Sequence, residues 1–221
     1  MELQDALSRR YSCRRFLGKP VDSALVRDLT ALAQQVPSWG NTQPWKVYAA
    51  AGPSALAIRQ GLVQAHTSNQ PEQPEIPMPQ GFGGLLMDRY RDLGKSLFAV
   101  LGIGRGDKDK RNAHYANNFD AFGASSLIYV TVPTEQSPYV ILDAGAFVTA
   151  FCLAAGERGL GTCILAALAR YPQVVRSVID IPGDESILIG LALGYPDPDA
   201  PANRFRSARA PLEQVLSLTG F

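Results

Sequence analysis

The chain has 221 residues, of which 46% are apolar, so it can bury a sizeable core and fits one large α/β domain better than two small ones. Its formal net charge of +1 gives no excess of either sign, which argues against nucleic acid, an anionic membrane or an acidic protein as a partner. We therefore expect its partners to be small molecules or a second copy of the chain.

The first part of the chain predicts two helices, a loop and a strand. Apolar residues at helical spacing predict a short helix over 3–10 and a second helix over 22–35, which Asp22 or Ser23 can cap. A loop rich in turn-forming residues follows. Residues 46–50 alternate in polarity, which indicates a strand.

The middle of the chain predicts helices on either side of an irregular segment. A helix is expected over 53–65, but several prolines and glycines within 66–84 predict neither helix nor strand there. We expect this segment to be a flexible excursion or a lid. Helical periodicity returns over 85–101, and the polar run from Lys108 to Arg111 predicts a solvated helix face.

Two later stretches predict central strands. Residues 126–132 are rich in β-branched and aromatic side chains, and 187–193 form a near-continuous apolar run. Between them, 143–158 predict a helix that is apolar on nearly all sides, as expected for a helix between a sheet and another subunit. Its most apolar part, 144–155, is about 12 residues long, well under the roughly 20 that cross a bilayer. Because these strands are distant in sequence, the sheet must be built from non-local pairs.

A dense group of arginines near the amino terminus is the first candidate binding site. Within seven positions stand Arg9, Arg10, Ser12, Arg14 and Arg15. The rigid guanidinium fork fits phosphate oxygens, and a serine hydroxyl adds a further donor. The alternative is a solvated basic edge, and this segment alone does not decide between them.

The loop PSWGNTQPW contains both tryptophans of the chain and several polar side chains. Ser38, Asn41 and Gln43 present hydroxyl and amide groups that can hydrogen-bond to a polar ring. The planar faces of Trp39 and Trp45 could lie beside an aromatic cofactor. Trp45 begins a strand, so we expect it in the core, whereas the role of Trp39 is left open.

Two further segments have both a structural and a functional interpretation. In 159–167, GLGTCILAA, small side chains leave the backbone open to a ligand, although a helix C-cap that leads into a strand also explains them. Residues 204–211, RFRSARAP, add three arginines. Taken alone, this segment indicates a solvated tail.

The remaining reactive residues predict no second site. Cys13, Cys152 and Cys163 are too few and too far apart for a disulfide framework, which fits a reducing, cytoplasmic setting. The amino terminus has no apolar core of the kind that a secretory signal needs. His66 and His114 are scattered, so we expect surface or structural roles for them and no metal site.

The ordered segments resemble the nitroreductase family of flavoproteins. RRYSCRRF resembles the family's amino-terminal phosphate motif, PSWGNTQPW its helix-to-strand loop, GLGTC its loop beside the flavin, and LGYPDPDAP with RAPLEQV its carboxy-terminal signature. NNFDAFGASSLIYVTV is similar to the middle of the nitrobenzoate-reductase branch. The resemblance covers almost the whole chain. It implies a single α/β (α+β) domain over 1–221, with a central mixed, mainly antiparallel sheet flanked by helices, in an interleaved homodimer.

The resemblance also implies a site for FMN at the interface of two subunits. The phosphate and ribityl end is implied to contact Arg10, Ser12, Arg14 and Arg209, with Tyr11 among them. Family members often have a lysine two positions before the terminal arginine, whereas this chain has Ser207. Arg206 is the candidate substitute.

Other contacts to the flavin are implied to come from the loop and from the backbone. The partner subunit is implied to contribute Pro37, Ser38 and Asn41, and Gln43 is implied to fix their loop. Trp39 of the same loop is a further candidate contact. The backbone at Leu165 and Ala166 corresponds to the place where an amide meets the flavin N5.

The implied activity is an FMN-dependent oxidoreductase. It would pass electrons from NADH or NADPH to nitroaromatic, quinone or similar electron-poor acceptors by a ping-pong mechanism, without a catalytic side chain beyond the flavin. The alternatives are a dehalogenase, dehydrogenase or flavin-fragmenting enzyme of the same fold, a non-catalytic flavin-binding protein, and an interaction protein without a cofactor. We expect a cytoplasmic homodimer without nucleic-acid or membrane partners.

Overall fold

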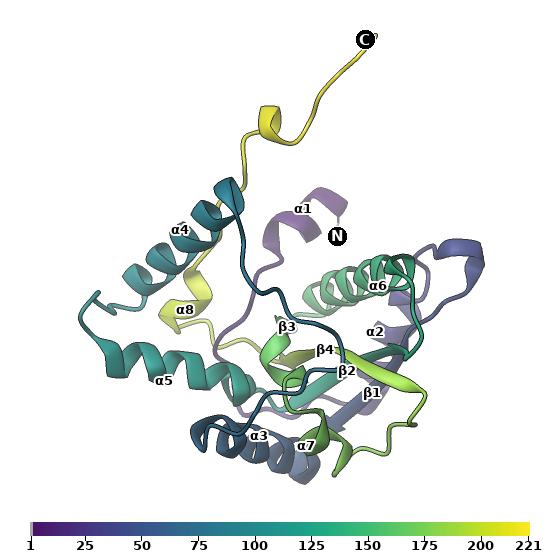
Figure 1. Ribbon diagram of the computed structural model, residues 1–221, viewed down its shortest axis with the longest axis vertical. Helices are drawn as coiled ribbons and strands as arrows, with labels where there is room; N and C mark the ends of the chain where they lie inside the picture. Colours follow the sequence, from purple (N-terminus) through teal and green to yellow (C-terminus); the bar gives the residue numbers. More distant parts are fainter. Residues whose placement is uncertain (1) are drawn as a thin grey trace.

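The computed structural model describes residues 2–221, and these contain four strands in one sheet (Figure 1). The strands are β1 (Lys46–Ala51), β2 (Ser126–Pro133), β3 (Gly161–Leu165) and β4 (Glu185–Gly194). Their order is β1-β2-β4-β3, and every neighbouring pair is antiparallel. A parallel contact is made outside these strands, by the isolated bridge between Ser12 and Thr162. The predicted sheet type and the two predicted central strands are confirmed.

The predicted helices are all present, although the one predicted over 143–158 begins at Pro138, and the structure adds short helices at 172–176 and 201–204. The helices are α1 (Leu3–Arg9), α2 (Ser23–Ala33), α3 (Gly52–Thr67), α4 (Gly84–Val100), α5 (Lys108–Phe119), α6 (Pro138–Glu157), α7 (Pro172–Arg176) and α8 (Pro201–Arg204), with 3-10 turns η1 (Trp39–Asn41), η2 (Ala121–Gly123), η3 (Ala166–Ala169) and η4 (Leu212–Gln214). Asp22 is the cap of α2, because its side chain accepts a hydrogen bond from the N–H of Ala24. The helix ends at Ala33, before the predicted Gln35.

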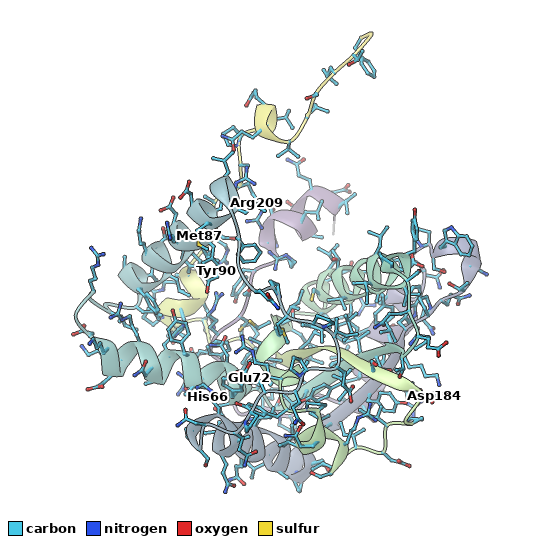
Figure 2. All side chains as sticks on the ribbon, viewed as in Figure 1. His66, Glu72, Met87, Tyr90, Asp184 and Arg209 are labelled. Carbon is cyan, nitrogen blue, oxygen red and sulfur yellow. The ribbon has the colours of Figure 1, made fainter. Side chains whose placement is uncertain are left out.

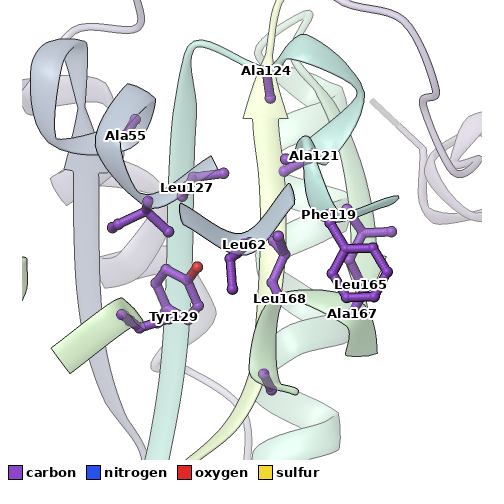
Figure 3. Close-up of a cluster of buried hydrophobic side chains, with 14 of the residues drawn as sticks. Ala55, Leu62, Phe119, Ala121, Ala124, Leu127, Tyr129, Leu165, Ala167 and Leu168 are labelled. Atoms are coloured by element: carbon purple, nitrogen blue, oxygen red, sulfur yellow. The ribbon is translucent and has the colours of Figure 1, made fainter. Parts of the chain in front are cut away.

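Successive side chains of β2 point to opposite faces of the sheet, so the core is divided into one cluster on each face. Leu127 and Tyr129 point to the face on which α3, α5 and η3 pack. Ile128 and Val130 point to the opposite face, which α2 and α6 cover. Figure 3 shows the first of these clusters, with Leu62 of α3 over the strands. The sheet is therefore the middle layer between two sets of helices.

The apolar helix α6 is a core helix. Its length and composition alone would allow it to cross a membrane, but seven of its residues are buried in this fold. Trp45 is only 6% exposed and stacks on Phe147 with ring centroids 5.2 Å apart, which confirms the predicted core position of Trp45. The opposite face of α6, which includes Leu142 and Gly145, is exposed.

Residues 70–83 form an extended strap without helix or strand, as predicted. The carboxylate of Glu75 accepts hydrogen bonds from Nε and Nη2 of Arg176, at 2.9 and 3.1 Å. It also accepts one from the N–H of Ile187 at 2.6 Å, beside the point where the pairing of β2 with β4 shifts its register. Glu72 pairs with Arg170 at 2.8 Å. These contacts hold the first half of the strap in place, so only its second half remains a candidate lid.

Close packing of η3 on the sheet depends on Gly190 of β4. Gly190 is paired with Leu165 of β3, and a Cβ atom at Gly190 would lie 2.5 Å from Cβ of Leu168. Real Cβ atoms do not approach this closely, so a glycine at this position lets η3 rest against β4. The packing fixes the backbone at the end of β3.

Gly190→Ala is expected to lower the free energy of unfolding by about 1–3 kcal/mol, because the added methyl group overlaps Leu168. Urea unfolding followed by circular dichroism measures this change. Gly183→Ala is the control, since it lies in an exposed turn where a new Cβ meets no atom within 4 Å, and it should change stability by less than about 0.5 kcal/mol. Equal stability of Gly190→Ala and the wild type would contradict the packing argument.

Glu75→Gln is expected to lower the free energy of opening the strap by about 1–3 kcal/mol, because the charge-assisted bonds to Arg176 are lost while the side chain keeps its shape. The measurement is the hydrogen–deuterium exchange rate of the N–H of Gln73, which bonds to the carbonyl of Arg170 in the held half of the strap and should exchange faster. Glu72→Gln is the matched control, because its ion pair is more exposed and should contribute less. If the N–H of Gln73 exchanges no faster in Glu75→Gln than in the wild type, other contacts hold the strap.

Candidate functional site

A cavity of about 330 Å³ lies where the two ends of the chain meet. Its lining residues are Leu7, Ser8, Arg10, Tyr11, Ser12, Arg14, Leu93, Phe205, Arg206, Ser207 and Arg209. Figure 2 shows Arg209 on the tail, where the tail passes between α1 and the beginning of α4. The two arginine-rich segments that the sequence singles out therefore face one cavity.

The chemistry of the lining residues fits an anion such as a phosphate group. Four of the eleven are arginines, three are serines and none is acidic. Guanidinium groups and hydroxyls are donors that suit phosphate oxygens, and the absence of a carboxylate from this lining leaves the positive charge uncompensated. The cavity is suited to the phosphate end of a nucleotide.

The amino-terminal arginine segment is held beside β3. Ser12 forms the parallel bridge to Thr162, and the N–H of Cys13 donates to the carbonyl of Thr162 at 2.8 Å. The approach is close, because a Cβ atom on Gly161 would lie 2.9 Å from Cβ of Cys13. A glycine at the first position of β3 therefore lets the arginine segment lie against the sheet.

The tail residues contact each other and the amino-terminal segment. Nη1 of Arg209 donates to the hydroxyl of Ser207 at 2.7 Å. The guanidinium of Arg206 lies 3.9 Å from the ring centroid of Tyr11, close enough for a cation–π contact. Burial raises the pKa of Tyr11, although the charge of Arg206 opposes this. Ser207 and Arg206 thus both line the cavity, Ser207 beside Arg209 and Arg206 over Tyr11.

The cysteine in the arginine segment is not a nucleophile. Cys13 is fully buried, and its Sγ donates a hydrogen bond to the carbonyl of Arg15. Burial raises the pKa of this thiol to about 11, so it stays protonated at neutral pH. Burial also raises the pKa of Cys152 and of Cys163, the latter to about 12.

Leu165 and Ala166 do not line the cavity, but they belong to the same edge of the sheet. Leu165 is the last residue of β3, and Ala166 begins η3. Thr162, which anchors the arginine segment, lies three residues before Leu165, about 10 Å along the strand. The end of β3 and the arginine cavity are therefore linked by one short strand.

The loop residues Pro37, Ser38, Trp39, Asn41 and Gln43 do not line the cavity of their own chain. The N–H of Trp39 donates to the buried carboxylate of Asp143 at 2.9 Å, which ties the loop to α6. Nε2 of Gln43 donates to the carbonyl of Asn41 at 3.1 Å, as expected for a residue that fixes the loop. The indole of Trp39 is 68% exposed.

The backbone of this loop is strained. Gly40, Asn41 and Gln43 all have positive φ angles, of 57°, 58° and 48°. A non-glycine residue rarely adopts this conformation unless its surroundings enforce it, and such strain clusters at functional sites. The surrounding structure therefore enforces the conformation of this loop, which does more than connect α2 to β1.

Both histidines have structural contacts. His66 stacks on Phe119 with ring centroids 4.0 Å apart. His114 contacts Phe98 edge-on and lies beside Phe122. Both histidines therefore make aromatic contacts within the fold.

The antiparallel sheet between two helical layers defines an α+β protein, and its arginine-lined cavity is suited to an anion. A model of the nitroreductase family matches residues 7–195, and the chain belongs to this family. The predicted family and its nitrobenzoate-reductase-like branch are confirmed.

Relatives within the family are similar over nearly the whole chain. The 4-nitrobenzoate reductase of Nocardioides sp. (strain LMS-CY) is 30% identical over 222 residues, which cover 98% of this chain and 90% of the relative. Nitroreductase NfnB of Mycolicibacterium smegmatis is 29% identical over 207 residues, with 93% and 88% covered. The crystal structure of the FMN and NADPH-dependent nitroreductase NfnB from Sphigopyxis sp. strain HMH has a TM-score of 0.95 at 32% identity and covers both chains fully.

The native thiols are expected to react with Ellman's reagent only through opening of the fold, because Cys13, Cys152 and Cys163 are all buried. At pH 8 the folded protein should therefore show no fast labelling, and all three thiols should react once guanidinium chloride unfolds the chain. Absorbance at the thionitrobenzoate wavelength measures the number and rate. Rapid labelling of a native thiol would contradict the burial of that cysteine.

Proposed function

We propose that this chain is an FMN-dependent oxidoreductase that passes electrons from NADPH or NADH to nitroaromatics, quinones or similar small acceptors. The observation that carries the proposal is the single cavity lined by Arg10, Arg14, Arg206 and Arg209 and by no acidic residue. A relative that is 30% identical is a 4-nitrobenzoate reductase, and a solved relative with a TM-score of 0.95 depends on FMN and NADPH. These relatives support both the cofactor and the class of acceptor.

The phosphate of FMN is proposed to lie in the arginine cavity. Arg10, Arg14 and Arg209 supply fork-shaped donors there, and the hydroxyl of Ser12 is a further donor. Arg206 already stacks on Tyr11 and adds positive charge at the same wall. In this proposal Arg206 supplies the positive charge that family members often place at this position as a lysine, and Ser207 adds a hydroxyl group.

The end of β3 is proposed to orient the flavin ring. When bound, FMN supplies the redox chemistry, since its ring takes up a hydride and later passes electrons on. The backbone of Leu165 and Ala166 is held by the packing of η3 on Gly190, so an N–H there can keep a fixed direction toward the ring. No side chain of this chain is proposed to act as a nucleophile or acid, in line with its buried, protonated thiols.

The site is proposed to be completed by a second copy of the chain. Pro37, Ser38 and Asn41 stand on a strained loop that is tied to α6 and that does not reach its own cavity. In a homodimer with twofold symmetry, the same loop of the partner subunit can reach this cavity's open side. The exposed face of α6, with Leu142 among small side chains, supports an interface beside the loop.

The setting is proposed to be the cytoplasm, with small molecules as the other partners. All three cysteines are free, which fits a reducing compartment. The net charge of +1 provides no general attraction for nucleic acid or an anionic membrane.

A flavin absorbance spectrum tests the proposal directly. The purified chain, supplied with FMN and freed of excess by gel filtration, is expected to retain a yellow chromophore. Anaerobic NADPH or NADH should bleach it, and 4-nitrobenzoate or a quinone should restore the colour. A chain that elutes colourless, or bound flavin that neither nicotinamide bleaches, would contradict the proposed function.

Mixing two defective variants tests whether the site is shared between subunits. Arg209→Ala removes a cavity donor, and Asn41→Gly removes a loop side chain while it tolerates the positive φ at that position. Each homodimer should be poorly active. Co-expressed, half of the dimers are mixed and carry one intact site each, so activity should recover to about a quarter of the wild-type value. No recovery above the two homodimers would contradict a shared site.

A further inference from the structure

Asn203 is a buried polar residue that joins α8 to the amino-terminal arginine segment. It is only 5% exposed. Its Oδ1 accepts a hydrogen bond from the N–H of Arg14 at 2.8 Å, across 189 positions of sequence. Its Nδ2 donates to the carbonyl of Arg15 at 2.7 Å and to the carbonyl of Asp197 at 2.8 Å. The side chain thus binds the backbone of both ends of the chain at once.

The chemistry at this position suits an asparagine side chain. An acceptor faces an N–H, and two donors face two carbonyl oxygens, so a rotated amide would place donor against donor. An aspartate would place a carboxylate oxygen against the carbonyls of Arg15 and Asp197. An alanine would leave the N–H of Arg14 and the carbonyl of Arg15 with fewer partners.

The contacts of Asn203 lie directly behind the cavity. Arg14, whose N–H donates to Asn203, lines the cavity. Phe205 and Arg206, which follow Asn203 in the chain, also line the cavity. Nη1 of Arg206 donates to the backbone carbonyl of Asn203 at 2.7 Å, and its guanidinium lies over Tyr11. Asn203 therefore connects the backbone of one arginine group to the segment that carries the other.

We propose that Asn203 is a positioning residue that sets the distance between the two arginine groups and so confers selectivity for the phosphate of the flavin nucleotide. The inference rests on the proposed FMN site. Like charges that line one cavity repel each other, so the arginines gather around a phosphate only if neutral bonds hold their backbones in place. Asn203 provides three such bonds without touching the cavity itself.

The test compares two flavins that differ in the phosphate alone. Flavin-free Asn203→Ala is titrated with FMN and with riboflavin, and binding is followed by quenching of flavin fluorescence. We expect the Kd for FMN to rise by about tenfold and the Kd for riboflavin to change by less than about twofold. An unchanged Kd for FMN, or an equal rise for both flavins, would overturn the role of Asn203.

Controls separate this role from a loss of stability. Leu29→Ala truncates a fully buried side chain in the opposite core cluster, so it destabilises the fold but should leave the ratio of the two Kd values unchanged. If Asn203→Ala does not fold, Asn203→Ser, which can keep one of the three bonds, should move the ratio in the same direction. Failure of the wild type to bind FMN would overturn the proposed function and this inference together. Wild-type binding with an unchanged ratio in the variant overturns only the inference.

Discussion

The repulsion between four guanidinium groups is the constraint on which the site depends. Arg10, Arg14, Arg206 and Arg209 line one cavity, and no carboxylate among the lining residues offsets their charge. The fold opposes this repulsion with neutral bonds, chiefly the backbone bridge of Ser12 to β3 and the amide contacts made behind the cavity. An anion that enters the cavity removes the repulsion, so ligand binding and the stability of this region are coupled.

Most of the secondary structure could be predicted from the sequence, because helical and strand periodicities are local. The core position of Trp45 was also predictable, since it begins a strand. The order of the strands was not, because β1, β2 and β4 are far apart in the chain. Gly190 and Glu75 have no local signal either. Gly190 is needed for contact with η3, and Glu75 accepts a hydrogen bond from a backbone N–H 112 positions away.

The candidate site could be predicted where several residues of the same chemistry lie close together in the sequence. Arginines crowded around Ser12 point to an anion. The cavity brings Arg10, Ser12 and Arg14 together with Arg209, whereas Arg9 and Arg15 do not line it. Asn203 could not be found in this way, because an asparagine between an alanine and an arginine is unremarkable until the fold places Arg14 against it. Periodicity and spacing do not reveal that the loop around Asn41 lies outside its own chain's cavity; only the family resemblance implied this.

The strand order β1-β2-β4-β3 has a consequence for the growing polypeptide. During synthesis β2 can pair early with β1, but its other edge stays open until β4, residues 185–194, has left the ribosome. The anion cavity closes later still, with the arrival of Arg209. A chain released before α8 would have one arginine group and no counterpart, so it would lack the proposed nucleotide site. On the proposed function, only finished chains could withdraw their cofactor from the cellular pool.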